Sequence, residues 1–103
     1  MFMILQDVNR NRKGYIMKIN SLFVLREIAD EYIVIPVGEE TEHVKGILYL
    51  NYEGAFLWKM LKDDQTEDSL VRALTEKFNV DDAVARHDIS DFLAELNRIG
   101  CIL

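Results

Sequence analysis

Only a few side chains in this sequence have the chemistry of a nucleophile, a metal ligand or a proton-transfer group. The two histidines, His43 and His87, lie far apart, and neither belongs to a His-x-x-x-His, His-Glu-x-x-His or Cys-x-x-Cys pattern. Cys101 is the only cysteine and stands in an apolar tail, so we predict a buried structural thiol. The sequence also lacks glycine-rich phosphate loops and the Gly-x-Ser-x-Gly nucleophile motif. It therefore predicts neither an enzyme nor a cofactor or metal site.

Two pairs of adjacent carboxylates could take part in general acid–base catalysis. Asp63-Asp64 and Asp81-Asp82 both fall at expected helix boundaries, where helix capping and turn formation account for them. His43 lies in a charged loop, and His87 lies beside the apolar stripe of a helix. We interpret both histidines as surface or boundary residues.

Composition narrows the class of partner. The 103 residues are 50% hydrophobic and 29% charged, which is typical of one soluble globular domain. The formal net charge of −6 argues against DNA, RNA or an anionic membrane, since such partners are bound mainly through Lys and Arg. We find neither a signal peptide nor a transmembrane segment, and the single cysteine fits a cytoplasmic location.

The charge is unevenly distributed. Residues 1–18 hold four basic residues and one acidic residue, a net charge of +3, and residues 19–103 carry −9. We interpret 1–18 as a basic N-terminal extension and 19–103 as the folded domain. The extension is either an added strand or flexible arm, or upstream sequence ahead of a natural start at Met17.

Three short apolar runs precede the helical part of the chain. They cover residues 22–25, 32–37 and 46–50, with polar connections at 28–31 and 39–43. Runs of this length and spacing predict an antiparallel meander of three strands. Pro36 cannot donate a hydrogen bond, so we expect it near a strand end or on an unpaired side.

After residue 50 the apolar period becomes helical. Three N-caps are expected, at Asn51, at Thr66 and at Asp81 or Asp82, and two helix ends, at Asn79 and Gly100. The apolar faces of the three predicted helices are Phe56, Leu57, Met60 and Leu61 with Trp58 at the margin, then Leu70, Val71, Leu74 and Phe78, then Ala85, Ile89, Phe92, Leu93 and Leu96. Strands followed by helices predict an α+β fold, with the helices on one face of the sheet.

The run at 46–50 is apolar at both alternating sets of positions, Ile47 with Tyr49 and Leu48 with Leu50. An antiparallel strand with one face in water should instead alternate apolar with polar residues. The helices can cover one set only. Either the chain itself covers the other set, for example with residues 1–18, or this strand is a sheet edge that pairs with an incoming strand.

Residues 22–103, about four-fifths of the chain, resemble the PqqD-like family, named for coenzyme PQQ synthesis protein D. The segments that carry the resemblance are Leu48–Trp58, Thr66–Val71, Phe78–Asp81, Asp88-Ile89, Phe92-Leu93 with Leu96, and the closing Gly100–Leu103. Residues 1–18 lie outside it.

The resemblance implies a winged-helix-like domain with a three-stranded antiparallel sheet followed by three helices. It implies a non-catalytic adaptor that binds the leader of a ribosomally made precursor peptide as an added strand. The adaptor presents this peptide to a modifying enzyme, often a radical SAM enzyme. The implied peptide-binding residues are Gly46, Ile47, Leu48, Tyr49 and Leu50 of the third strand and Ile89, Phe92, Leu93 and Leu96 of the third helix. No cofactor is implied, and we expect a monomer or weak dimer.

Two alternatives remain open on the sequence. One is a winged-helix DNA-binding regulator, but the third helix has only Arg86 and Arg98 against five acidic residues. The other is a scaffold whose exposed strand pairs with a second copy or a partner enzyme. The five acidic residues either favour a basic leader or form a solvated face: Asp81, Asp82, Asp88, Asp91 and Glu95.

Overall fold

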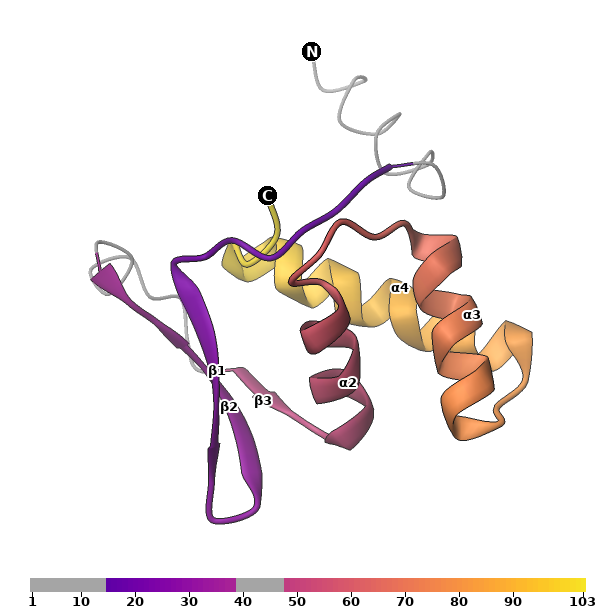
Figure 1. Ribbon diagram of the computed structural model, residues 1–103, viewed down its shortest axis with the longest axis horizontal. Coiled ribbons are helices and arrows are strands. Elements are labelled where there is room, and N and C mark those ends of the chain that lie inside the picture. The colour runs from indigo at the N-terminus through magenta and orange to yellow at the C-terminus, as the bar shows by residue number, and fades with distance from the viewer. Residues whose placement is uncertain (1–14, 39–47) are drawn as a thin grey trace.

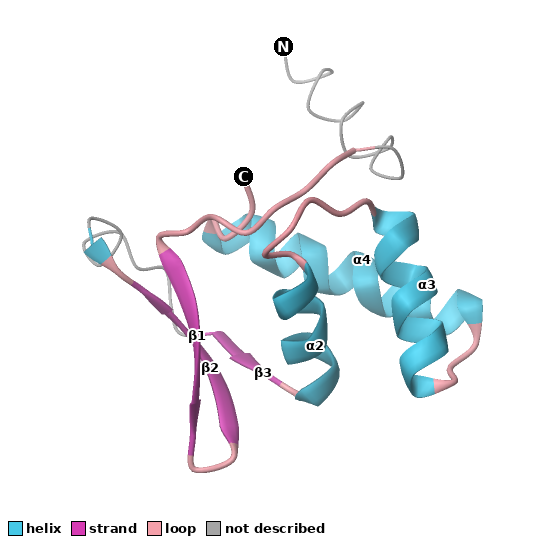
Figure 2. Ribbon diagram, viewed as in Figure 1, coloured by secondary structure: helices cyan, strands magenta, loops and turns pink. Residues whose placement is uncertain are grey.

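The strands come first along the chain and form one small sheet, and the helices follow. The computed structural model describes residues 15–38 and 48–103. Its elements are β1 (Phe23–Ile28), β2 (Glu31–Pro36), β3 (Leu48–Leu50), α2 (Tyr52–Met60), α3 (Glu67–Phe78) and α4 (Asp82–Ile99) (Figure 1). The three strands are antiparallel in the order β1-β2-β3, and the helices lie together beside the sheet (Figure 2). The predicted α+β fold, with three strands followed by three helices, is confirmed.

A two-residue turn joins β1 and β2. Ala29 and Asp30 both have positive φ, 51° and 67°, as a type I′ turn requires. This turn matches the twist of the flanking strands, so the ladder continues to the pair Ile28–Glu31. The sequence predicted a connection over 28–31, and that prediction was too long, because Ile28 and Glu31 belong to the strands.

Pro36 ends β2, as predicted, and lies opposite Phe23. The next pair is joined by the Val37 N–H, which donates to the Leu22 carbonyl over 2.8 Å. Because hydrogen-bonded and non-bonded pairs alternate along an antiparallel ladder, Pro36 is in a non-bonded pair with β1. Its missing N–H therefore costs the β1–β2 ladder no hydrogen bond.

The helix boundaries follow local capping chemistry. The side chains of Asn51, Thr66 and Asp81 accept hydrogen bonds from the first turns of α2, α3 and α4. Asn79 and Gly100 end α3 and α4 in the left-handed conformation. All of these caps and ends were predicted, since each depends on a few neighbouring residues.

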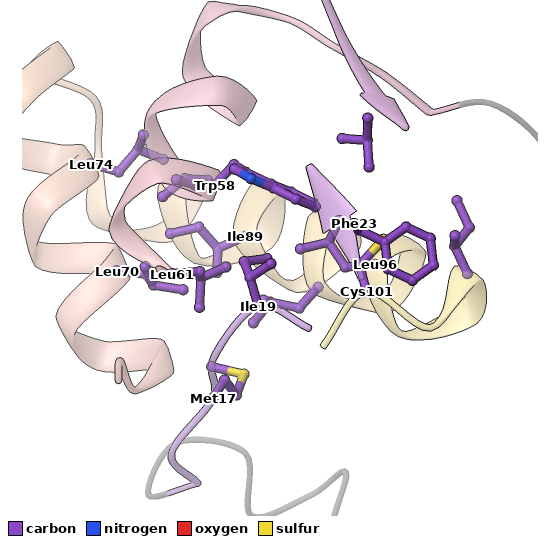
Figure 3. Close-up of a cluster of buried hydrophobic side chains, with 14 of the residues drawn as sticks. Met17, Ile19, Phe23, Trp58, Leu61, Leu70, Leu74, Ile89, Leu96 and Cys101 are labelled. Atoms are coloured by element: carbon purple, nitrogen blue, oxygen red, sulfur yellow. The ribbon is translucent and has the colours of Figure 1, made fainter. Parts of the chain in front are cut away.

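Trp58 lies at the centre of the hydrophobic core and is only 1% exposed (Figure 3). The sequence placed it at the margin of the apolar face, which is wrong. Phe56 and Met60, predicted on the face, are only partly buried. The reason is the position of α2, which contacts both β3 and α3. Residues on more than one side of this helix are therefore covered.

The segment before β1 packs against the far end of the chain. Met17 is buried, and its backbone exchanges hydrogen bonds of 2.7 and 2.9 Å with Gln65. Ile19 pairs with Ile102, so the start of the described chain runs beside the C-terminus (Figure 1). Met17 thus belongs to the core, while residues 1–14 of the predicted extension lie outside the described residues. Cys101 is buried, as predicted.

Candidate functional site

β3 lies at one edge of the sheet and β1 at the other, and within residues 15–38 and 48–103 β3 pairs only with β2. Its partners are Tyr32 for Leu50, Ile33 for Tyr49 and Val34 for Leu48. An edge strand exposes a row of backbone donors and acceptors that can pair with another chain.

The register shows which backbone groups of β3 point to that edge. The hydrogen bond from Val37 to Leu22 fixes the alternation along β2, so Ile33 bonds to β1 and its neighbours Tyr32 and Val34 turn toward β3. Leu50 and Leu48 are therefore the residues that bond to β2. The Tyr49 N–H and C=O point the other way, and no backbone hydrogen bond from the described part of the chain reaches them.

A groove runs between this edge and α4, and we call it the β3–α4 groove. Its lining residues are Leu48, Tyr49, Leu50, Asn51, Glu53, Gly54, Leu57, Leu74, Asp88, Asp91, Phe92 and Glu95. The start of α2 contributes to the lining, and Gly54 allows the helix to approach the strand. A Cβ there would lie 3.3 Å from the Cβ of Leu50 and 3.2 Å from the Asn51 side-chain oxygen.

The side chains of β3 divide between the two faces of the sheet. Leu48 and Leu50 are partly buried against the core, while Tyr49 projects from the other face and is 60% exposed. The prediction that the domain covers one of the two alternating sets of side chains on this strand is confirmed. Gly46 and Ile47, also predicted to bind peptide, lie outside the described residues.

The predicted residues of α4 separate into two groups. Ile89, Leu93 and Leu96 are 0–1% exposed in the core and do not line the groove. Phe92 is half-buried and does line it. Beside Phe92, α4 presents Asp88, Asp91 and Glu95 to the groove; the sequence left open whether these acidic residues favour a basic leader or form a solvated face. Their helical spacing around Phe92 was the available signal.

The lining of the groove is acidic. Its described lining residues include four carboxylates, Glu53, Asp88, Asp91 and Glu95, and no Lys or Arg. Arg98 donates to Glu95 over 2.6 Å, and this hydrogen bond lowers the pKa of the Glu95 carboxyl. Asp88 and Asp91 each lie 3.7 Å from the Nδ1 of His87, which is exposed, as predicted. Among the described residues, the groove therefore combines an apolar floor, a strand edge without a second partner strand and a negative rim.

The other chemistry-bearing residues are accounted for by the fold. Asp81 caps α4 by accepting from the Ala83 N–H, and Asp63 and Asp64 are exposed in the turn between α2 and α3. Within residues 15–38 and 48–103, no group of three or more Asp, Glu, His or Cys side chains could hold a metal ion. None of the described helices is both long and apolar enough to span a membrane. His43 lies outside the described residues.

The model of the family described as "Coenzyme PQQ synthesis protein D (PqqD)" matches residues 31–102. The chain belongs to the PqqD family. The matched range contains β2, β3 and all three described helices, so it includes every residue that lines the groove. The resemblance noted in the sequence is thus confirmed.

Two solved structures share this PqqD fold. TbiB1, solved in complex with the TbiA(beta) leader peptide, has a TM-score of 0.65 and 22% identity, covering 82% of this chain and 93% of TbiB1. The PqqD truncation of Methylobacterium extorquens PqqCD has a TM-score of 0.68 and 15% identity, covering 88% of this chain and 92% of that one. The latter is described as a functional and stand-alone recognition element for ribosomally synthesized and post-translationally modified peptides. A search of curated proteins gave no significant match.

Proposed function

We propose that this PqqD-family protein is a non-catalytic adaptor that binds the leader of a ribosomally made precursor peptide and presents it to a modifying enzyme. The observation that carries the proposal is the outward direction of the Tyr49 N–H and C=O, at an open sheet edge beside a groove. An extended peptide can add there as a fourth strand. Family membership and the leader peptide bound to the similar TbiB1 support the same function.

The energetics fit binding shared between backbone and side chains. Each strand-to-strand hydrogen bond contributes about 0.5–1.5 kcal/mol net. The two bonds at Tyr49 are too few for tight binding alone, so apolar leader side chains must fill the groove between Leu48 and Phe92. Each such apolar side chain contributes about 1.5–3 kcal/mol to binding when it is fully buried. The loss of conformational freedom in the leader offsets a few kcal/mol of this gain.

The proposed contacts follow the lining of the groove. Leu48, Tyr49, Leu50 and Phe92 contact the peptide directly, and Gly46 and Ile47, which precede them in the sequence, are further proposed contacts. Ile89, Leu93 and Leu96 act from the core, where their burial holds α4 in place. We further propose a cytoplasmic location and a radical SAM enzyme as the partner that modifies the presented peptide.

Two substitutions at one position test the proposal. Tyr49→Pro removes the N–H that points away from β2 and leaves the β2–β3 bonds intact, and proline is tolerated at such edge positions. Tyr49→Ala keeps the N–H and removes the side chain. The probe is a synthetic leader of the precursor peptide encoded beside the gene, with affinity measured by calorimetry.

We expect Tyr49→Pro to abolish leader binding while its circular dichroism and melting curve stay close to those of the unmodified protein. Tyr49→Ala should retain most of the binding. Equal binding by the proline variant and the unmodified protein would rule out strand addition at β3. A Leu48→Pro variant, which loses a β2–β3 bond, serves as the control for damage to the sheet.

A further inference from the structure

A second hollow lies at the C-terminal end of β3, in the corner between the β1–β2 turn and the start of α2. We call it the hairpin hollow, and it is lined by Glu27, Asp30, Glu31, Tyr32, Tyr49, Leu50, Asn51 and Tyr52. It shares Tyr49, Leu50 and Asn51 with the β3–α4 groove. A strand that pairs with Tyr49 would therefore lie along one hollow and reach the other.

The hairpin hollow combines aromatic rings with negative charge. Of its lining residues in the described part of the chain, three are tyrosines, three are carboxylates and none is Lys or Arg. The rings of Tyr32 and Tyr52 lie 6.5 Å apart, and the Lys59 Nζ stands 5.8 Å from the Tyr32 ring centre. The Tyr32 ring therefore already makes a cation–π contact with a lysine of the same chain. Partial burial, then Glu27, Tyr52 and Asp30, raise the pKa of Tyr32.

In the described part of the chain, most carboxylates of the two hollows form no ion pair with Lys or Arg, and Asp88 and Asp91 have the exposed His87 3.7 Å away. Together their lining residues include seven carboxylates: Glu27, Asp30, Glu31, Glu53, Asp88, Asp91 and Glu95. Within residues 15–38 and 48–103, only Glu95 of these forms an ion pair with an arginine. A bound strand with positive side chains would supply the missing counter-charges on both sides of Tyr49.

We infer that the strand bound at β3 is a basic peptide segment, with cationic side chains on either side of the residue that pairs with Tyr49. One cation faces Asp88 and Asp91, and another enters the hairpin hollow between its tyrosines and carboxylates. Arginine suits the hairpin hollow best, because its planar guanidinium both stacks on aromatic rings and bonds carboxylates in pairs. The inference rests on the proposed function and adds the charge of the ligand.

The charge of this surface also favours a basic peptide over two other occupants, a second copy of the domain and a nucleic acid. A second copy of the domain would bring residues 19–103, with a net charge of −9, against an acidic surface. Such like-charge contacts are unfavourable. Nucleic acid is disfavoured for the same reason.

The test uses the full chain and a displayed library of random peptides of about 12 residues, a length that spans about 40 Å when extended. Enriched peptides should carry more Lys and Arg than Asp and Glu, relative to the starting library. Their affinity for the unmodified protein should fall when the salt concentration is raised, since exposed charge pairs are screened. This salt measurement needs no variant and so does not depend on any substitution folding.

Three double variants test where the cations of the bound peptide lie. Asp88→Asn/Asp91→Asn should weaken binding of the selected basic peptides roughly three- to tenfold, and Glu27→Gln/Glu31→Gln should do the same. Asp63→Asn/Asp64→Asn removes the same charge from the exposed turn between α2 and α3 and should change the affinity less than about twofold.

The outcomes separate this inference from the proposed function. Enriched peptides that are neutral or acidic, yet shift the Tyr49 amide signal, would overturn the basic-peptide inference and leave strand addition standing. An equal loss of affinity in all three double variants would overturn the placement of the cations. Enrichment of no peptide, or only of peptides that leave the Tyr49 amide signal unchanged, would overturn both.

Discussion

The Asn51 side-chain oxygen accepts a hydrogen bond from the Gly54 backbone N–H over 2.8 Å. This cap starts α2 at Tyr52, only two residues after the end of β3. The strand edge and the first turn of the helix are therefore held together without an intervening loop. Both residues line the β3–α4 groove, so the same contact that begins the helix also shapes the site.

Asn51→Ala should lower the free energy of unfolding by about 0.5–2 kcal/mol, because it leaves a first-turn N–H of α2 without its partner. Urea denaturation followed by circular dichroism measures this change. Asn97→Ala, at an exposed position within α4, is the matched control and should not destabilise the protein, because alanine is the better helix former. Equal stabilities for the two variants would show that the cap does not stabilise α2.

Leu96→Ala should destabilise the fold by about 2–5 kcal/mol, since Leu96 is completely buried in the core. Leu103→Ala removes the same atoms from a largely exposed side chain and should change the stability by less than about 0.5 kcal/mol. Denaturant midpoints measure both. A stable Leu96→Ala variant that had lost only peptide binding would place Leu96 in the binding surface instead of the core.

Ala29→Asn should stabilise the protein by roughly 0.5–1 kcal/mol. Ala29 has a φ of 51°, a conformation that costs an alanine more than an asparagine. The same change in a helix, Ala94→Asn on α4, should be destabilising, because asparagine is a poorer helix former than alanine. Melting temperatures that move in the same direction for both variants would contradict the type I′ turn.

The ion pair between Glu95 and Arg98 should make its full contribution to stability above the ordinary pKa of a glutamate, about 4.3. The hydrogen bond from Arg98 lowers the pKa of Glu95 in the folded state, so the contribution is lost as the pH falls through that lowered value. Carboxyl ¹³C NMR titration of Glu95 measures the shift. Arg98→Gln should raise the Glu95 pKa; an unchanged value would exclude Arg98 as the cause.

The sequence predicted the order of the elements and most of their ends, because caps such as Asn51 and Gly100 depend on local backbone chemistry. It could not place Trp58. The helical period identifies one apolar face, whereas α2 is covered on more than one side by elements distant in sequence. Likewise, β-branched residues marked β2, but the two-residue turn at Ala29 and Asp30 carries no glycine signal.

The candidate site was predicted in part. The doubly apolar pattern of the third strand left two interpretations open, cover by the chain itself or a sheet edge, and β3 lies at one edge of the sheet. On α4, a stripe of apolar residues cannot show which members face the core and which face a groove. Which residues face the groove depends on the position of β3 relative to α4. Phe92 lines the groove, whereas Ile89 and Leu93 are buried in the core.

The most direct test of strand addition is the exchange rate of the Tyr49 amide proton, measured by ¹H–¹⁵N NMR with and without the leader peptide. Tyr49 points its N–H away from β2, so a bound strand should protect this proton. At a peptide concentration of about ten times Kd or more, its exchange should slow by about tenfold. The Leu48 and Leu50 amides, which already face β2, serve as internal references. A bound peptide that leaves the Tyr49 amide exchange unchanged would contradict the account.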